Sequence, residues 1–196
     1  MTPFLTSTTM TPARVRLLHQ DQAPLAVRAY FSRGDPGPIA ASLAHLPDLM
    51  PQALSFLGGA LGGAWLPVRT KELVILRVSA LAGCRYCTAA HTVVALDNGL
   101  TREQVRGLRG EVPHTDVLTD PQDLAVVAWS DAVHAGGEAD LAKARELIGR
   151  YHDDGAVVEL TVCATATLML NRYATSLALP ISDETLARLA HERLPA

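Results

Sequence analysis

The sequence is poor in aromatic residues and in charge. Phe, Trp and Tyr together make up 5% of its 196 residues, and Asp, Glu, Lys and Arg make up 19%. Lysine and arginine number 17 and aspartate and glutamate 20, without long runs of either sign. A sequence with this charge balance has no basic segment of the kind that binds nucleic acid or an anionic membrane surface. We therefore expect neither as a partner.

Long hydrophobic runs are also missing. A helix that spans a bilayer needs about 20 apolar residues with an unbroken backbone. The uncharged segment 49–68 contains two prolines and four glycines, and the apolar run 160–170 is too short. The first residues show no basic region followed by an apolar one, so we expect no secretory signal and a cytoplasmic protein.

Alanine and leucine are abundant, at 30 and 29 residues. This composition is typical of helices, and no segment has the pattern of a strand, so we predict an all-α, multi-helix bundle. Hydrophobic residues reach 48% and the mean hydropathy is +0.16, which is apolar for a chain that does not enter a membrane. The excess predicts that the subunit covers apolar surface by self-association.

Proline and glycine divide the chain into successive helices. We expect an N-terminal arm over 1–11 and a first helix from about residue 12, both within 1–38, then one helical domain over 39–196. Helices are predicted over 69–82, 84–98, 121–135, 138–153 and 156–179, with further ones opened by a capping box at Thr101 and Gln104 and by a cap at Ser182. The helices at 69–82 and 156–179 are apolar almost all round, which predicts burial on every side.

The chain contains a weak internal echo. Aligning Glu72–Cys87 with Glu159–Ala174 gives five identities in sixteen positions. The echo predicts two internally related halves. Only the first copy carries a cysteine pair, so only that copy is capable of thiol chemistry.

The most informative stretch is Cys84-Arg85-Tyr86-Cys87, followed four residues later by His91. On a helix Cys84, Cys87 and His91 project within about 60° of one another. His91 lies about 6 Å along the axis from Cys87 and about 10 Å from Cys84, so His91 is expected to serve Cys87. The three side chains predict one redox site.

A free thiol has a pKa of about 8.5, and the thiolate is the nucleophile. His91 is able to take the Cys87 proton, and the C-x-x-C spacing lets the two sulfurs close a disulfide. Cys84 lies near a helix N-terminus, which also lowers the pKa of a thiol. The residues alone leave open which sulfur attacks first.

Glu72 joins the site only if the chain reverses at residues 82–83. A straight helix would hold Glu72 about 18 Å from Cys84, whereas an antiparallel hairpin over 69–98 places Glu72 beside His91. The carboxylate would then orient the imidazole. The competing interpretation is a carboxylate at a helix start that pairs with Arg77 or another cation.

Two structural interpretations of the cysteines compete with the redox one. C-x-x-C plus a histidine supplies three zinc ligands, and a fourth would have to come from His45, His114, His134 or Cys163, none at a diagnostic spacing. In the second interpretation the two cysteines are unreactive structural residues of an oligomeric scaffold domain. Cys163, Trp65 and Trp129 are expected to be core residues.

E-x11-C-x-x-C-x-x-x-H on two helices, followed by a helix ending LMLNRYATSLALP, resembles the carboxymuconolactone decarboxylase-like superfamily, specifically its alkylhydroperoxidase D-like (AhpD-like), peroxidase-related branch. The resemblance covers about residues 45–180. It implies the AhpD-like fold with duplicated halves and a homo-oligomer, often a trimer or a multiple of it, with a dimer as another option. It also implies antioxidant reduction of hydroperoxides by thiols, recycled by an external dithiol carrier, with no metal or organic cofactor.

By position, the resemblance makes Cys87 the attacking cysteine, Cys84 its disulfide partner, and His91 and Glu72 the proton relay. The chain departs from the family at Tyr86, where the best-known member has a histidine. A phenol with a pKa of about 10 is a poor substitute, so slow peroxidase turnover is expected. The decarboxylase branch typically lacks the cysteine pair, which makes a lactone decarboxylase the weaker alternative.

Overall fold

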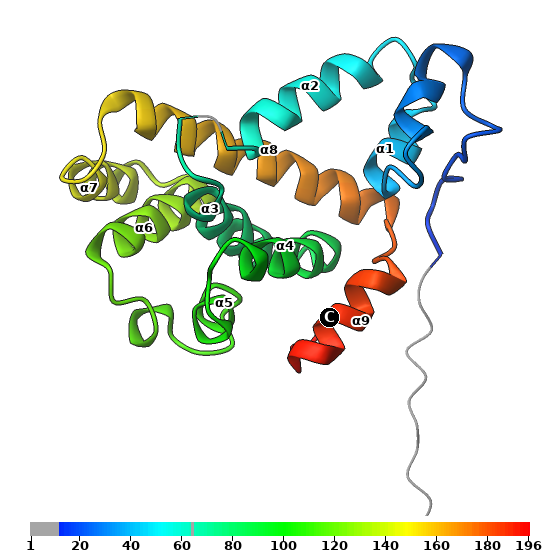
Figure 1. The fold of residues 1–196 in the computed structure, drawn as a ribbon. Coiled ribbons are helices and arrows are strands. Elements are labelled where there is room, and N and C mark those ends of the chain that lie inside the picture. Colours follow the sequence, from blue (N-terminus) through cyan, green and yellow to red (C-terminus); the bar gives the residue numbers. More distant parts are fainter. Residues whose placement is uncertain (1–11, 64) are drawn as a thin grey trace, which may run out of the picture.

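The structure is a computed structural model that describes residues 12–63 and 65–196. Its α-helices are α1 (Pro38–Leu43), α2 (Met50–Leu61), α3 (Val68–Leu81), α4 (Arg85–Asp97), α5 (Arg102–Leu108), α6 (Pro121–Ala135), α7 (Glu138–Ile148), α8 (Asp154–Leu177) and α9 (Asp183–Glu192). Two 3₁₀ segments are also present: Leu25–Phe31 precedes α1, and His114–Asp116 lies between α5 and α6 (Figure 1). No strand occurs in the described residues, and the all-α prediction is confirmed.

Local capping chemistry sets the helix starts that the sequence predicted. Thr101 and Gln104 form a reciprocal capping box at α5. Asp120 accepts the N–H of Gln122 at the start of α6, and Ser182 accepts the N–H of Thr185 at α9. Each side-chain oxygen satisfies a backbone donor that has no partner inside its helix.

The helix predicted from about residue 12 is wrong. Residues 12–24 contain no helix, and the first helical turns are the 3₁₀ segment Leu25–Phe31. The backbone N–H of Arg14 donates to Leu177 O, and that of Leu18 donates to Ala41 O. These tertiary hydrogen bonds replace helical ones. The arm expected over 1–11 lies outside the described residues.

The helix predicted over 138–153 ends early, at Ile148. Asp153 is the N-cap of α8, where its carboxylate accepts the N–H of Ala156 at 2.8 Å. A residue at an N-cap has extended backbone torsions, so it cannot also continue the preceding helix.

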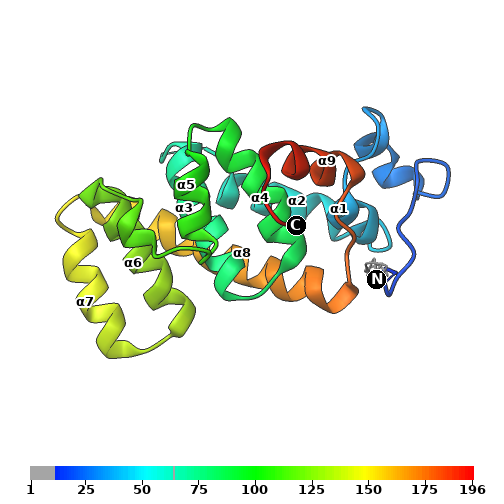
Figure 2. The ribbon, with the colours of Figure 1, turned by 90° about the horizontal axis from the view of Figure 1, so that it is seen from below.

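Helix α3 lies at the centre of the molecule, where it packs against α4, α6 and α8 (Figures 1 and 2). Its apolar residues from 73 to 76 and Val78 are at most 1% exposed. Arg69 and Arg77 each make two hydrogen bonds to a carboxylate of α6, on Asp123 and Asp131. The prediction of a helix buried on nearly all sides is confirmed for α3.

Burial on all sides is wrong for α8. Val158 is 62% exposed and Met169 51%, and both lie on one stripe of the helix. The opposite face carries the buried residues that contact α3, α4 and α6. Trp65, expected in the core, is 76% exposed, whereas Trp129 is buried and donates its indole N–H to Thr161.

The internal echo does not mark a repeated hairpin. Glu72–Cys87 crosses the turn between α3 and α4, whereas residues 159–174 all lie within the single helix α8. The two halves predicted from the echo therefore gain no support from these segments and stay a prediction. None of the helices in the described part of the chain is long and apolar enough to cross a bilayer.

Candidate active site

The chain reverses between α3 and α4, as the hairpin prediction required. Gly83 adopts a φ of 66°, in the left-handed region that glycine enters without strain. The N–H of Cys84 then donates to Ser79 O at 3.0 Å, which closes the turn. The second helix consequently runs back along the first.

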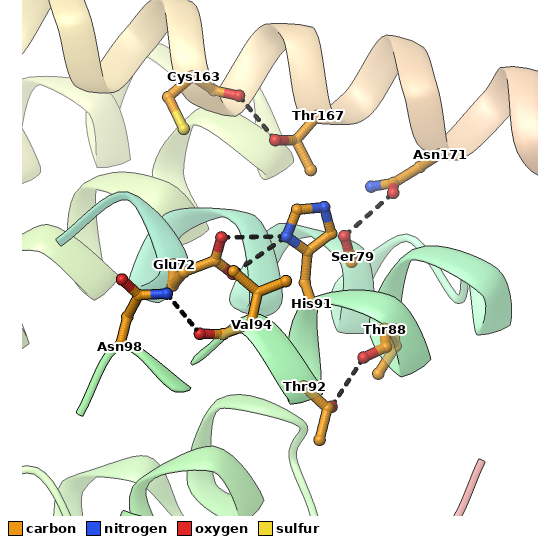
Figure 3. A network of polar contacts seen from close by, with 10 residues as sticks. All are labelled: Glu72, Ser79, Thr88, His91, Thr92, Val94, Asn98, Cys163, Thr167 and Asn171. Carbon is orange, nitrogen blue, oxygen red and sulfur yellow. Dashed lines mark hydrogen bonds and ion pairs between the residues drawn. The ribbon is translucent and has the colours of Figure 1, made fainter. Parts of the chain in front are cut away.

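This reversal places Glu72 against His91. Nδ1 of His91 lies 3.1 and 3.0 Å from the two carboxylate oxygens of Glu72 (Figure 3). The Glu72 side chain is 3% exposed and the His91 side chain 23%. The competing pairing with Arg77 is wrong, because Arg77 binds Asp131. An ionised carboxylate only accepts hydrogen bonds, so Nδ1 of His91 carries a hydrogen, and in the neutral ring the lone pair is on the second nitrogen.

The two cysteines are buried, at 1% and 4% exposed, and both sulfurs are free. Cys84 is the N-cap of α4, and its Sγ accepts the N–H of Cys87 at 3.4 Å. A hydrogen bond from the Cys87 thiol is the main cause that lowers the pKa of Cys84 to about 6. The backbone N–H groups of Cys87 and Tyr86 and the Thr175 hydroxyl act in the same direction, against burial. Cys84 is therefore a thiolate at neutral pH.

Cys87 has the opposite character. Its hydrogen bond to Cys84 raises the pKa of the Cys87 thiol, and burial and the neighbouring Cys84 charge raise it further. His91 follows Cys87 by one turn of α4, about 6 Å along the axis. Within the described residues, every hydrogen bond of the His91 ring is to Glu72. The sulfur that needs a base is thus the one on the His91 side of the pair.

Tyr86 stands where the resemblance expected a histidine. Burial and the nearby thiols raise the pKa of its phenol to about 12. Tyr86 therefore stays protonated at neutral pH and is no base.

A cavity of about 230 Å³ opens at the Cys84 side of the pair. Its polar lining includes Cys84, Tyr86 and Thr175, and its apolar wall comes from the end of α8 and the residues after it: Ala174, Ala178, Leu179 and Ile181. Cys87 is not among the lining residues. Of the two cysteines, Cys84 is the one that lines this cavity.

The sequence analysis missed Thr175 and gave Asn171 no role. Asn171, Ala174 and Thr175 recur at helical spacing on α8, and Ala174 packs against the cysteine pair. The spacing shows that these residues share a face. No local signal shows that the face meets a turn formed about 90 residues earlier.

The residues considered as zinc ligands do not gather around the pair. Over residues 12–63 and 65–196, no three His, Cys, Asp or Glu side chains are grouped closely enough to hold a metal ion. Nε2 of His45 lies 2.8 Å from Arg16 O. Cys163 is fully buried, and burial raises the pKa of its thiol to about 12. The expectation that Cys163 is a core residue is confirmed.

Residues 47–112 match the model of the carboxymuconolactone decarboxylase family. This segment contains Glu72, Cys84, Cys87 and His91, whereas the α8 residues that complete the site lie outside it.

Solved structures share the fold of this chain at low identity. An uncharacterized peroxidase-related protein from Silicibacter sp. TM1040 is 16% identical with a TM-score of 0.76, over 92% of this chain and 97% of that one. A second such protein, from Ralstonia eutropha JMP134 and described as an alkylhydroperoxidase AhpD core, is 17% identical with a TM-score of 0.73, over 88% and 94%.

The debrominase Bmp8, solved in complex with 2,3,4-tribromopyrrole, is 18% identical with a TM-score of 0.72, over 95% of this chain and 98% of that one. No curated protein matches the chain. The three structures share their AhpD-like fold with this chain.

Proposed function

We propose that this protein reduces small organic hydroperoxides with the Cys84–Cys87 pair and is recycled by a dithiol. One observation carries the proposal: a stabilised Cys84 thiolate lines a cavity, with a protonated Cys87 hydrogen-bonded to it. The apolar wall of the cavity favours an organic hydroperoxide over hydrogen peroxide.

In the first step the Cys84 sulfur attacks the terminal oxygen of the hydroperoxide. The O–O bond breaks, and the departing alkoxide takes a proton from solvent and leaves as an alcohol. Cys84 is then a sulfenic acid. This step needs no base, because the attacking thiol is already ionised.

In the second step Cys87 needs a base because its thiol is protonated. The second nitrogen of His91 accepts that proton while Glu72 holds Nδ1–H. The Cys87 sulfur attacks the Cys84 sulfur, the S–O bond breaks, and the departing hydroxide takes the proton that His91 holds and leaves as water. A disulfide joins the pair.

An external dithiol then reduces the disulfide and becomes a disulfide itself. The net reaction converts one hydroperoxide and one dithiol into an alcohol, water and a disulfide. This order makes Cys84 the attacking sulfur and so reverses the roles that the resemblance implied. A pair that is reduced after every turnover suits a reducing compartment, and the cytoplasm is part of the proposal.

The test is consumption of tert-butyl hydroperoxide in the presence of a small dithiol. Wild type is expected to turn over and Cys84→Ser to be inactive. Cys87→Ser is expected to form the Cys84 sulfenic acid once, detectable by a sulfenate-trapping reagent, and to stop. Equal rates in wild type and Cys84→Ser would overturn the proposal, and so would stoichiometric zinc that is lost on alkylation of the pair.

We also propose a homo-oligomer. Val158, Val162 and Met169 form an apolar stripe on α8, exposed by 62%, 36% and 51%, and Phe56 and Trp65 are further exposed apolar side chains. Large exposed apolar side chains aligned on one face of a helix are typical of a subunit interface.

A further inference from the structure

The second ring nitrogen of His91 faces a buried polar pair from two other helices. Ser79 Oγ in α3 donates to Oδ1 of Asn171 in α8 at 3.1 Å, and these residues are 0% and 1% exposed. Nδ2 of Asn171 is also buried and has no hydrogen-bond partner among the described residues. An unpaired amide donor inside a protein is unfavourable and calls for an explanation.

The helix geometry places Asn171 on the Cys87 side of His91. Ser79 follows Glu72 by seven residues, about 10 Å along α3 toward the turn. Cys87 precedes His91 by four residues, about 6 Å along α4 toward the same turn. Figure 3 shows the imidazole between Glu72 and the Ser79–Asn171 pair, with its second nitrogen on the side of Asn171.

A nitrogen that takes up a proton changes from a hydrogen-bond acceptor to a hydrogen-bond donor, so it needs a different neighbour before and after the transfer. Before transfer, the second nitrogen of His91 is an acceptor and suits an N–H neighbour; after transfer it is a donor and suits a C=O neighbour. A carboxamide has both groups. The Ser79 hydroxyl donates to Asn171 Oδ1 in this structure and is equally able to accept from Nδ2.

We propose that Asn171, oriented by Ser79, is a positioning residue for His91 that supports the ring both before and after proton transfer. The amide N–H, unpaired in this structure, is available to the neutral ring, and after a half-turn the amide turns its C=O to the protonated ring, while Ser79 exchanges its role. Glu72 holds the other nitrogen throughout. The inference rests on the proposed function, in which His91 takes the Cys87 proton.

The test uses the aromatic disulfide dithiobisnitrobenzoate, which separates the two sulfurs without a peroxide. The Cys84 thiolate attacks its S–S bond and releases one coloured aromatic thiolate, which leaves a mixed disulfide. Cys87 then attacks the Cys84 sulfur, His91 takes the Cys87 proton, and the second aromatic thiolate leaves. Stopped-flow absorbance resolves the two releases, and Cys87→Ser identifies the first.

Asn171→Leu and the isosteric Asn171→Asp, which lacks the donor, are expected to slow the second release about tenfold and to change the first less than about twofold. Ser79→Ala is also expected to slow the second release. Thr167→Val is the matched control: Thr167 lies one turn earlier on the same face of α8, and its hydroxyl donates to Cys163 O. This control should leave both releases unchanged.

A double-mutant cycle separates positioning from packing. In a His91→Gln background the second release is slow already, and Asn171→Leu is expected to slow it no further. Equal slowing of both releases, unchanged release in both Asn171 variants, or full additivity with His91→Gln would overturn the inference. A normal second release without hydroperoxide consumption would instead overturn the proposed function alone.

Discussion

Glu72 and His91, 19 residues apart in the sequence, meet across the α3–α4 turn with both carboxylate oxygens within 3.1 Å of Nδ1. The contact assigns the two ring nitrogens different roles, because the nitrogen bound to the carboxylate carries hydrogen and the other carries the lone pair. One buried carboxylate therefore prepares His91 to act as a base toward the protonated sulfur of the pair.

The reactivity of Cys84 is expected to rise with pH through a midpoint of about 6, because its folded pKa is lowered to about 6. Above that pH the thiolate is present, and below it the thiol is protonated and unreactive. The rate of alkylation by iodoacetamide from pH 4 to 9, with mass spectrometry to locate the adduct, measures the midpoint. Cys87→Ala should move the midpoint upward, because it removes the hydrogen bond with the largest effect. A midpoint above 8 in wild type would contradict the assignment.

Glu72→Gln is expected to slow disulfide closure about tenfold or more and to spare the first attack, because a neutral amide no longer stabilises the imidazolium that forms. Single-turnover kinetics with tert-butyl hydroperoxide measures both steps. Asp131→Asn is a suitable control, since Asp131 binds Arg77 of the same helix α3 and lies outside the site. Slowing of closure by the control to the same extent would assign the effect to general loosening of α3.

Lys71→Met is expected to lower the free energy of unfolding by about 3 kcal/mol, the order of loss when a buried pair loses one partner. Nζ of Lys71 is fully buried, 2.7 Å from Glu159 Oε1 and 3.0 Å from Ala60 O at the end of α2. Urea unfolding followed by circular dichroism measures the loss. Lys71→Met combined with Glu159→Gln should recover part of it, because the carboxylate is then no longer left unpaired. A single variant as stable as wild type would show that the pair is dispensable.

Val158→Asp is expected to shift the protein toward the monomer, because it places a charge in the apolar stripe of α8. Light scattering after size-exclusion chromatography gives the mass of wild type and variant. Glu146→Gln, an exposed change on α7 outside the stripe, is the control and should keep the wild-type mass. A wild type that is monomeric at micromolar concentration would refute the oligomer.

Much of the helical plan could be predicted from the sequence because its causes are local. Thr101 with Gln104 and Asp120 with Gln122 define helix starts through hydrogen bonds within four residues. The predictions failed where a distant partner decided the outcome. The backbone N–H groups of Arg14 and Leu18 donate to carbonyls of α8 and α1 instead of to a helix of their own. Asp153 is the N-cap of α8 instead of the end of the preceding helix.

The sequence by itself determined that Cys87 and His91 share one stripe of α4, with Cys84 at its start, since the period of a helix places residues four apart on the same face. Only the tertiary structure decided what surrounds that stripe. The carboxylate of Glu72 arrives through the turn, whereas Asn171 and Thr175 arrive from α8, about 90 residues away. Which of the two sulfurs is the thiolate depends on the hydrogen-bond donors around each sulfur and on its burial. Both follow from how the helices pack, so they cannot be predicted from the spacing of residues along one helix.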